Sequence, residues 1–441
     1  MLSLIGFATI ITIVVLLIRG KMTPIIPLVV VPIIGALVAG FQITELGDFF
    51  SDGIASVIQV VIMFIFAILF FGIMQDAGLF DPIIDKMIKM THGNVVTIAV
   101  GTIFIAAISQ LDGSGASTFL ITIPALLPIY RQMKMSPYLL LLLTAGSASI
   151  MNMIPWAGPL GRAASVLGMD PTDLWRPMIP VQIIGMVLMI GLAVFVGMRE
   201  KKKIISHYGS IENAIAATEG NGTVFDRKKN GKENITKTKK YWLNVALTVA
   251  VISVLIAGII PAGLAFMIGV CLALPLNFRK AEDQNGALRK HAPNALTMAT
   301  IILAAGSFLG ILGGTGMLDS IAEDTVTVMP EFIAPYIHII IGMLGVPFDL
   351  LLSTDAYYFA LLPVVEQIGA TFGIASISTA YAMIIGNIVG TFVSPFSPAL
   401  WLALGLAGLE MGKHIRYSFF WLWGLSIVLI FIAILLGVIS L

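Results

Sequence analysis

Long runs of apolar residues, separated by short polar segments, dominate this chain. Residues 2–18, 24–41, 54–74 and 419–441 carry no charged side chain, and about 20 consecutive apolar residues are enough to span a bilayer. Hydropathy therefore predicts an all-α integral membrane protein whose helices cross the bilayer ten times. The crossings lie near residues 2–18, 24–41, 54–78, 137–154, 178–198, 241–259, 262–276, 295–316, 375–392 and 418–440.

Two further apolar stretches, residues 93–130 and 331–369, are interrupted in the middle by small and acidic residues. We expect each to form a re-entrant hairpin, which enters and leaves the membrane on the same side. Non-helical backbone at membrane depth persists only where protein or water satisfies its N–H and C=O groups. Five crossings and one hairpin then fall in each half. An odd number of crossings makes the halves antiparallel, which is the inverted-repeat arrangement of many secondary transporters.

The predicted repeats are residues 1–198 and 241–441, joined by a polar linker at residues 199–240. Each hairpin is followed by a span that paired prolines interrupt, and a proline removes a backbone donor and breaks a helix. The two predicted broken helices occupy residues 137–168, with Pro155 and Pro159, and residues 375–409, with Pro395 and Pro398. We therefore expect discontinuous helices at mid-membrane depth in both halves.

Composition and charge support a membrane protein and give it an orientation. The chain is 58% hydrophobic and 11% charged, whereas soluble domains have about a quarter charged residues. Positively charged loops stay cytoplasmic, so we place the basic linker 199–240 in the cytoplasm. When the crossings are counted outward from the linker, every lysine and arginine except Arg162 and Arg176 falls on the cytoplasmic side. This arrangement predicts a multi-pass cell-membrane protein with both termini extracellular, and the net charge of +1 gives no sign of nucleic-acid binding.

The two interrupted stretches share a sequence pattern. The first contains Asp112, then Ser117-Thr118, then the sequence Ala-Leu-Leu-Pro at 125–128; the second contains Asp349, then Ser353-Thr354, then Ala-Leu-Leu-Pro at 360–363. Because the same order recurs at corresponding places in both halves, we expect the two hairpin tips to form one site near the bilayer midplane.

Carboxylates at these tips are the candidates for proton coupling or metal binding. Asp112 and Asp355 lie at the tips, and Asp349 lies close by. An ionisable group at membrane depth is costly and is a functional candidate by default. Desolvation disfavours the charged form of a carboxyl group, so that a buried one can take up and release a proton. The alternative is a carboxylate that water simply hydrates at the mouth of a hairpin.

Hydroxyl and amide side chains are the candidates for substrate binding. They could ligate a cation or hydrogen-bond a carboxylate, or they could merely allow helices to pack closely. Asn152 and Asn387 precede the two breaks and could instead cap unwound backbone. The complete set of candidates around the tips and breaks is Ser117, Thr118, Asn152, Gly158, Ser353, Thr354, Asn387, Ser394 and Ser397.

Arg162 is a candidate of a different kind. It lies beside the first break and outside the inside-positive pattern. A guanidinium group can bind a carboxylate through two parallel hydrogen bonds, so we expect it to contact an anionic substrate. An ordinary arginine in an outer loop is the alternative for Arg162. We interpret Arg176, in the polar stretch 173–177, as an interfacial residue.

Several motifs resemble those of the citrate–metal:proton symporters, the CitMHS family within the wider ion-transporter superfamily. They are Asp112-Gly-x-Gly with its following Ser/Thr pair, Met151-Asn-x-Ile-Pro-Trp-x-Gly-Pro159, Gly161-Arg-Ala-Ala-Ser165 and Phe80-Asp-Pro-Ile. Members of this superfamily share two inverted repeats with re-entrant hairpins.

The resemblance implies import of citrate, complexed with a divalent cation such as Mg or Ca, together with protons. It implies no permanently bound cofactor, and a homodimer in the lipid bilayer. It also implies that Ser117, Thr118, Ser353 and Thr354 hold the cation and a substrate carboxylate. Many family members have a second acidic residue where this chain has Ser114, so Ser114 bears on the choice of metal.

Other functions stay open at this point. The nearest alternative is a sodium- or proton-coupled carrier of free di- or tricarboxylates, or of a sugar acid such as gluconate. A membrane sensor or scaffold that transports nothing is a second. No P-loop, GxSxG, HExxH or dinucleotide-binding motif appears in a suitable context. We therefore expect no enzyme, and transport that an ion gradient drives or that runs passively.

Overall fold

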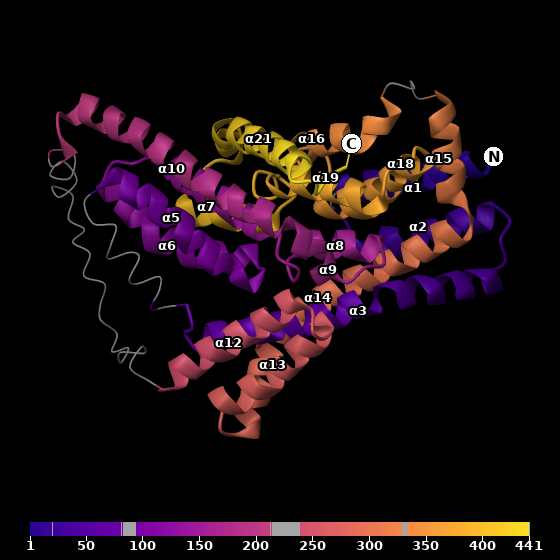
Figure 1. Cartoon of the computed structure of the whole chain (residues 1–441), viewed down its shortest axis with the longest axis horizontal. Helices are drawn as coiled ribbons and strands as arrows, with labels where there is room; N and C mark the ends of the chain where they lie inside the picture. Colours follow the sequence, from indigo (N-terminus) through magenta and orange to yellow (C-terminus); the bar gives the residue numbers. More distant parts are fainter. Residues whose placement is uncertain are drawn as a thin grey trace.

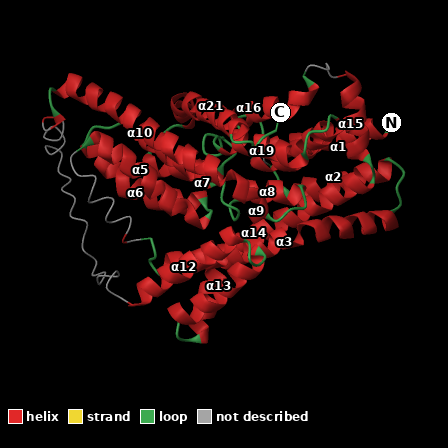
Figure 2. Cartoon of the chain, in the orientation of Figure 1, coloured by secondary structure: helices red, strands yellow, loops and turns green. Residues whose placement is uncertain are grey.

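The computed structural model describes residues 1–19, 21–80, 82, 94–211, 213, 239–328 and 333–440. Throughout these ranges the regular structure is helical (Figure 2). Six of the described helices are long and apolar enough to cross a membrane, and shorter apolar helices accompany them. The predicted all-α membrane fold is thus confirmed. Lys86, Lys89, Glu331 and most of the linker 199–240 lie outside the described residues.

Two series of helices follow one another along the chain (Figure 1). The first comprises α1 (Leu2–Arg19), α2 (Ile25–Val38), α3 (Ile43–Asp76), α5 (Val95–Ser109), η1 (Gln110–Asp112), α6 (Gly115–Gln132), α7 (Pro137–Met151), α8 (Gly158–Val166), α9 (Pro171–Trp175), η2 (Arg176–Met178) and α10 (Ile179–Tyr208). The second comprises α12 (Lys239–Ala257), α13 (Ala262–Asn277), α14 (Ala281–Gly314), α15 (Met317–Val328), η4 (Ala334–Tyr336), α16 (Ile337–Met343), α17 (Gly345–Phe348), η5 (Ala356–Leu361), α18 (Leu362–Thr371), α19 (Ser376–Ile388), α20 (Pro398–Ala407) and α21 (Met411–Leu435).

Helices α3 and α14 form an antiparallel pair that runs through the molecule, and each has 34 residues. Gly53 near the start of α3 meets Gly306 and Gly310 near the end of α14, whereas Gly72 meets the ring of His291 near the start of α14. A Cβ atom at Gly53 would lie 2.1 Å from the carbonyl oxygen of Gly306. Only glycine allows the two backbones to approach this closely.

Both long helices extend further than hydropathy predicts. Helix α3 takes in Glu45, Asp48 and Asp52, which lie in the segment between the predicted crossings 24–41 and 54–78. At its start, the backbone N–H of Gln42 donates a 2.7 Å hydrogen bond to Glu45 Oε2, and acidic residues stabilise the positive N-terminal end of a helix. The polar start of α14 is likewise helical and includes Lys290. Hydropathy detects only apolar residues, so it does not predict polar residues that continue a helix beyond the apolar span.

The two interrupted stretches form helix pairs. Helices α5 and α6 pack against each other around η1, and α16 packs against α18 around the irregular residues that follow α17. The spans after them are discontinuous, as predicted. Residues 152–157 separate α7 from α8, and residues 389–397 separate α19 from α20.

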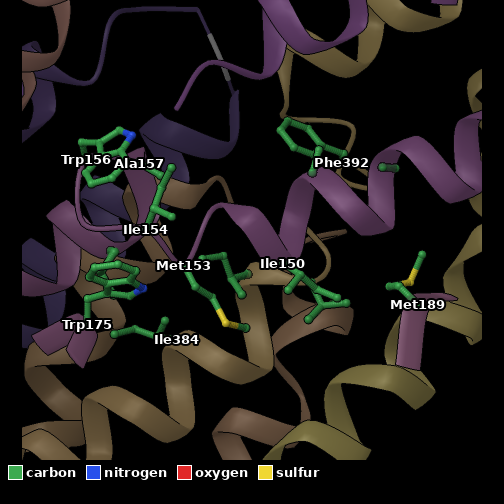
Figure 3. Close-up of a cluster of buried hydrophobic side chains, with 14 of the residues drawn as sticks. Ile150, Met153, Ile154, Trp156, Ala157, Trp175, Met189, Ile384 and Phe392 are labelled. Carbon is green, nitrogen blue, oxygen red and sulfur yellow. The ribbon is translucent and has the colours of Figure 1, made fainter. Parts of the chain in front are cut away.

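A buried apolar cluster joins the two broken helices (Figure 3). Met153 and Trp156, from the first break, lie in one cluster with Ile384 of α19 and Phe392 of the second break. The ring of Trp156 also stacks on Phe71 of α3, with ring centroids 4.9 Å apart. The breaks are therefore held in position by a shared core, which fixes the polar groups beside them.

Candidate functional site

A cavity of about 660 Å³ lies between α3, the tip of the first hairpin, the start of α8 and α14. Its size is within the range of small-molecule sites, about 300–1,000 Å³. The wall includes the apolar side chains Phe64, Ile68, Trp156 and Met298. Its polar lining consists of Gln75, Asp76, Asp112, Ser114, Ser117, Lys290, His291, Asn294 and Thr297.

Asp112 is oriented at the tip of the first hairpin. The backbone N–H of Ser114 donates a 2.8 Å hydrogen bond to its Oδ1 atom, and the Ser117 hydroxyl donates to its Oδ2 atom. Between them, Gly113 has a φ of +75°, a conformation that glycine adopts readily. A Cβ atom there would lie 2.9 Å from the carbonyl oxygen of Trp156. The tip is thus docked against the first break.

A chain of hydrogen bonds beneath the tip holds it to that break. Thr118 donates to Gln110 Oε1 over 2.6 Å, and Gln110 Nε2 donates to Asn152 Oδ1 over 2.6 Å. The indole N–H of Trp156 donates to the carbonyl oxygen of Leu111 over 2.8 Å. Thr118 and Asn152 are buried and occupied in this network. They therefore support the tip and do not line the cavity.

Sequence reasoning missed Gln110 as part of this network. A polar residue directly before the acidic tip, at the end of an apolar run, was the available signal. Burial of a polar group without a partner is costly, so a glutamine at this depth must find hydrogen-bonding groups nearby. The indole N–H of Trp156, within the motif at 151–159, has the same requirement.

Arg162 lies directly behind the cavity wall. Its Nε atom is 2.6 Å from Asp355 Oδ1, and the two side chains are only 11% and 13% exposed. Gly158 lines the cavity, and a Cβ atom there would lie 2.6 Å from Arg162 Nη1. The ion pair therefore joins α8 to the part of the second hairpin that leads through η5 into α18.

The second hairpin and second break form a separate buried cluster. Asp349 is 1% exposed, and its Oδ2 atom has no hydrogen-bond partner among the described residues. A Cβ atom at Gly390 would lie 2.3 Å from that oxygen. Ser394 donates to the backbone carbonyl of Asp349 over 2.6 Å. The Asn387 amide donates to the Gly345 carbonyl over 3.3 Å, and its Oδ1 is likewise without a described partner.

The remaining candidates lie at helix starts. Ser353 Oγ accepts a 3.2 Å hydrogen bond from the backbone N–H of Ala356, Thr354 follows it, and Ser397 is the residue before α20. Of the predicted site residues, the cavity lining contains Asp112, Ser114, Ser117 and Gly158. The others divide between the network beneath the tip, the ion pair behind the wall, the second hairpin and the second break.

A charged group at the mouth of the cavity was not predicted. Asp76 ends α3, and its Oδ1 lies 2.5 Å from Lys290 Nζ, while its Oδ2 lies 3.0 Å from His291 Nε2. The predicted crossing at residues 295–316 leaves Lys290 in a loop before it. The extension of α14 over 281–294 places it and Asn294 on the cavity instead.

Comparison with known proteins identifies the family. A model of the citrate transporter family CitMHS matches residues 9–386. The chain is 34% identical to a citrate transporter of Bacillus subtilis (strain 168) over 444 residues, covering 100% of both proteins. It is 36% identical to the Mg²⁺/citrate complex secondary transporter of the same organism over 442 residues, covering 100% of this chain and 99% of the relative.

A solved structure is similar in fold. It is that of MtrF of Neisseria gonorrhoeae, from a class of antimetabolite efflux pumps, with a TM-score of 0.60 and 14% identity over 90% of this chain and 84% of that one. At this identity the likeness concerns the fold alone. The sequence matches extend over the whole cavity and both breaks, and the chain belongs to the CitMHS family of citrate transporters, which are transporters and not enzymes.

Proposed function

We propose that this protein is a secondary active transporter that imports citrate as a complex with a divalent cation, Mg²⁺ or Ca²⁺, together with protons. The observation that carries the proposal is the cavity whose lining combines the Asp112 carboxylate with the Lys290 and His291 side chains. Such a cavity offers groups of both signs to a ligand that itself contains a cation and carboxylates. The relative that transports an Mg²⁺/citrate complex supports the same substrate.

The charges of ligand and cavity match best when citrate is complexed. Citrate carries about three negative charges at neutral pH, since its carboxyl groups titrate below that pH, and a divalent cation leaves about one. Mg²⁺ and Ca²⁺ prefer oxygen ligands, which Asp112, Ser114 and Ser117 supply at the tip. Free citrate would bring three unbalanced charges to membrane depth, where ions are expensive.

We assign the transported proton to Asp349. Asp112 accepts two hydrogen bonds and Asp355 pairs with Arg162, and each of these interactions offsets part of the cost of burying an ionised carboxylate. The Oδ2 atom of Asp349 has no hydrogen-bond partner among the described residues, and no described Lys or Arg forms an ion pair with this carboxyl group. The Asn387 side chain is its polar neighbour. Because burying an unpaired charge costs far more than burying a neutral carboxyl group, Asp349 fits the protonated form in this conformation.

The predicted topology completes the proposal. Two inverted repeats, residues 1–198 and 241–441, are joined by the cytoplasmic linker 199–240, and both termini are extracellular. Asp76 and Lys290 lie at the ends of α3 and α14 that this orientation puts inside, so the cavity opens to the cytoplasm. The protein functions as a homodimer, as resemblance to the family implies.

The test is citrate uptake by the purified protein in proteoliposomes. Radiolabelled citrate is supplied with Mg²⁺, with Ca²⁺ or with EDTA, under an imposed proton or sodium gradient. We expect uptake that requires the metal and an inward proton gradient. Equal uptake in EDTA would mean a free carboxylate as substrate, and uptake that follows only the sodium gradient would overturn proton coupling.

A further inference from the structure

A second polar cavity lies between α10 and α21, away from the substrate cavity. Its volume is about 520 Å³, and its polar and aromatic lining comprises Arg199, Glu200, Lys203, Arg416, Tyr417 and Trp421. The two helices come from opposite halves of the chain and pack against each other (Figure 1). The basic residues 199–203 lie at the end of α10 that the charge pattern predicts to be cytoplasmic.

The cations around this cavity lack ion-pair partners in the part of the chain that the structure describes. Arg199 and Lys203 are four residues apart on α10 and so share one helix face, and Arg416 faces them from α21. No ion pair between any of the three and a described acidic residue is present. The acid in the described lining, Glu200, is 7% exposed and accepts a 2.8 Å hydrogen bond from the backbone N–H of Ser136. The cavity therefore has an excess of positive charge.

Aromatic and apolar side chains continue the cavity towards the lipid. Trp421 lies against Phe195, with ring centroids 6.0 Å apart, and Phe195 and Phe420 are 48% and 72% exposed. Tyr417 lies beside Tyr138, with centroids 6.2 Å apart. Tryptophan and tyrosine are enriched where the hydrocarbon meets the headgroups. The site thus has cations at its polar end and exposed apolar rings at the other.

We propose that this cavity binds the phosphate of an anionic phospholipid, with the acyl chains lying along Phe195 and Phe420. Arginine donates two parallel hydrogen bonds to phosphate oxygens, and lysine adds a compact charge. Basic pockets between transmembrane helices on the cytoplasmic side bind such headgroups. The alternative is that these basic residues only set the orientation of the protein in the membrane. That role does not require residues of two different helices to line one cavity together with Tyr417 and Trp421. The proposal does not depend on the transported substrate.

The test measures lipid binding to the full-length protein, purified and delipidated in a neutral detergent. Phosphatidylglycerol, phosphatidylcholine and inorganic phosphate are added separately, and bound lipid is counted by native mass spectrometry alongside the thermal unfolding temperature. We expect phosphatidylglycerol alone to bind and to raise that temperature, because a ligand of the native state stabilises it. The variant R199Q/K203Q/R416Q should lose about tenfold to a hundredfold in affinity.

The matched control is K202Q/R279Q/K280Q, which removes the same charge from exposed positions outside the cavity. An equal loss in the control would mean general charge attraction and would overturn the proposal. Equal binding of phosphatidylcholine would also overturn it. So would inorganic phosphate that raises the unfolding temperature as much as phosphatidylglycerol does and displaces the bound lipid. If the triple variant fails to fold, the single substitution Arg416→Gln at an exposed position gives the same comparison against Lys202→Gln.

Discussion

Arg162 and Asp355 are 193 positions apart in the chain, and the Arg162 Nε atom lies 2.6 Å from Asp355 Oδ1. Arg162 belongs to α8, and Asp355 immediately precedes η5 in the second hairpin. Both side chains are close to nine-tenths buried. The pair therefore ties the first broken helix to the second hairpin, directly behind Gly158 in the cavity wall.

Removing one partner of this pair should destabilise the protein more than removing both. Asp355→Ala leaves a buried guanidinium unpaired, which costs about 3–5 kcal/mol, whereas loss of both charges is often near neutral. We expect a lower thermal unfolding temperature for Asp355→Ala and partial recovery in the double variant with Arg162→Ala. A double variant as unstable as the sum of the single ones would mean that the two charges do not stabilise each other.

Arg162 should also contribute to citrate affinity. Its Nε atom serves Asp355, while Nη1 lies next to Gly158 at the cavity wall. A hydrogen bond to a charged group contributes about 1.5–3 kcal/mol, so Arg162→Ala should raise the KM for citrate by roughly tenfold or more. Arg176→Ala is the control, because its partner Asp173 is 57% exposed. Similar KM values for the two variants would contradict a substrate contact.

Local sequence predicted the parts of the cavity that belong to one motif. Asp112, Ser114 and Ser117 fall within six residues of a tip whose glycines require a tight turn, so their proximity follows from chain geometry. The partner of Arg162 could not be predicted in this way. Several acids were equally plausible, and the choice of Asp355 depends on how two distant helices pack.

The cavity mouth was missed for a different reason. Whether Lys290 lies in a loop or on a helix depends on where α14 begins. Hydropathy does not reveal this start, because the first residues of α14 are polar. Antiparallel packing with α3 decides the matter, because it sets Gly72 against the ring of His291. That contact joins residues far apart in the chain, and it cannot be predicted from a single sequence.

Asp349→Asn should separate proton coupling from substrate binding. Asparagine has nearly the shape of a protonated carboxyl group, so the buried cluster with Asn387 and Ser394 should persist. We expect loss of uptake driven by a pH gradient, with exchange of internal for external citrate retained. Asp112→Asn should instead weaken binding of metal–citrate in both assays. Full pH-driven uptake by Asp349→Asn would remove this residue from proton transfer.

The contact between α3 and α14 should depend on single glycines. A Cβ atom at Gly310 would lie 2.1 Å from the Phe49 carbonyl oxygen, whereas one at Gly313 would meet nothing within 4 Å. Gly310→Val should therefore push the helices apart and cost about 1–3 kcal/mol, as overpacking does. Gly313→Val is the matched control. Equal unfolding temperatures of the two variants would mean that this crossing tolerates separation.

Asp76 should lower the positive potential at the cavity mouth, because it accepts hydrogen bonds from both Lys290 and His291. Asp76→Asn removes the negative charge and leaves Lys290 unpaired, so an anionic complex should approach more readily. We expect the KM for citrate to fall by about twofold to fivefold at low ionic strength. The difference should disappear at high salt, where the Debye length shrinks from ~10 Å at 0.1 M to ~3 Å at 1 M.

The control for this effect is Asp48→Asn, which removes an exposed charge from the other end of α3. Because that end lies far along the helix from the cavity, its KM should stay unchanged at both salt concentrations. A KM that rises in Asp76→Asn at every salt concentration would mean that the three side chains brace α3 against α14 and do not act through their charge. In that case the unfolding temperature should fall together with the affinity, since the same contacts would support both.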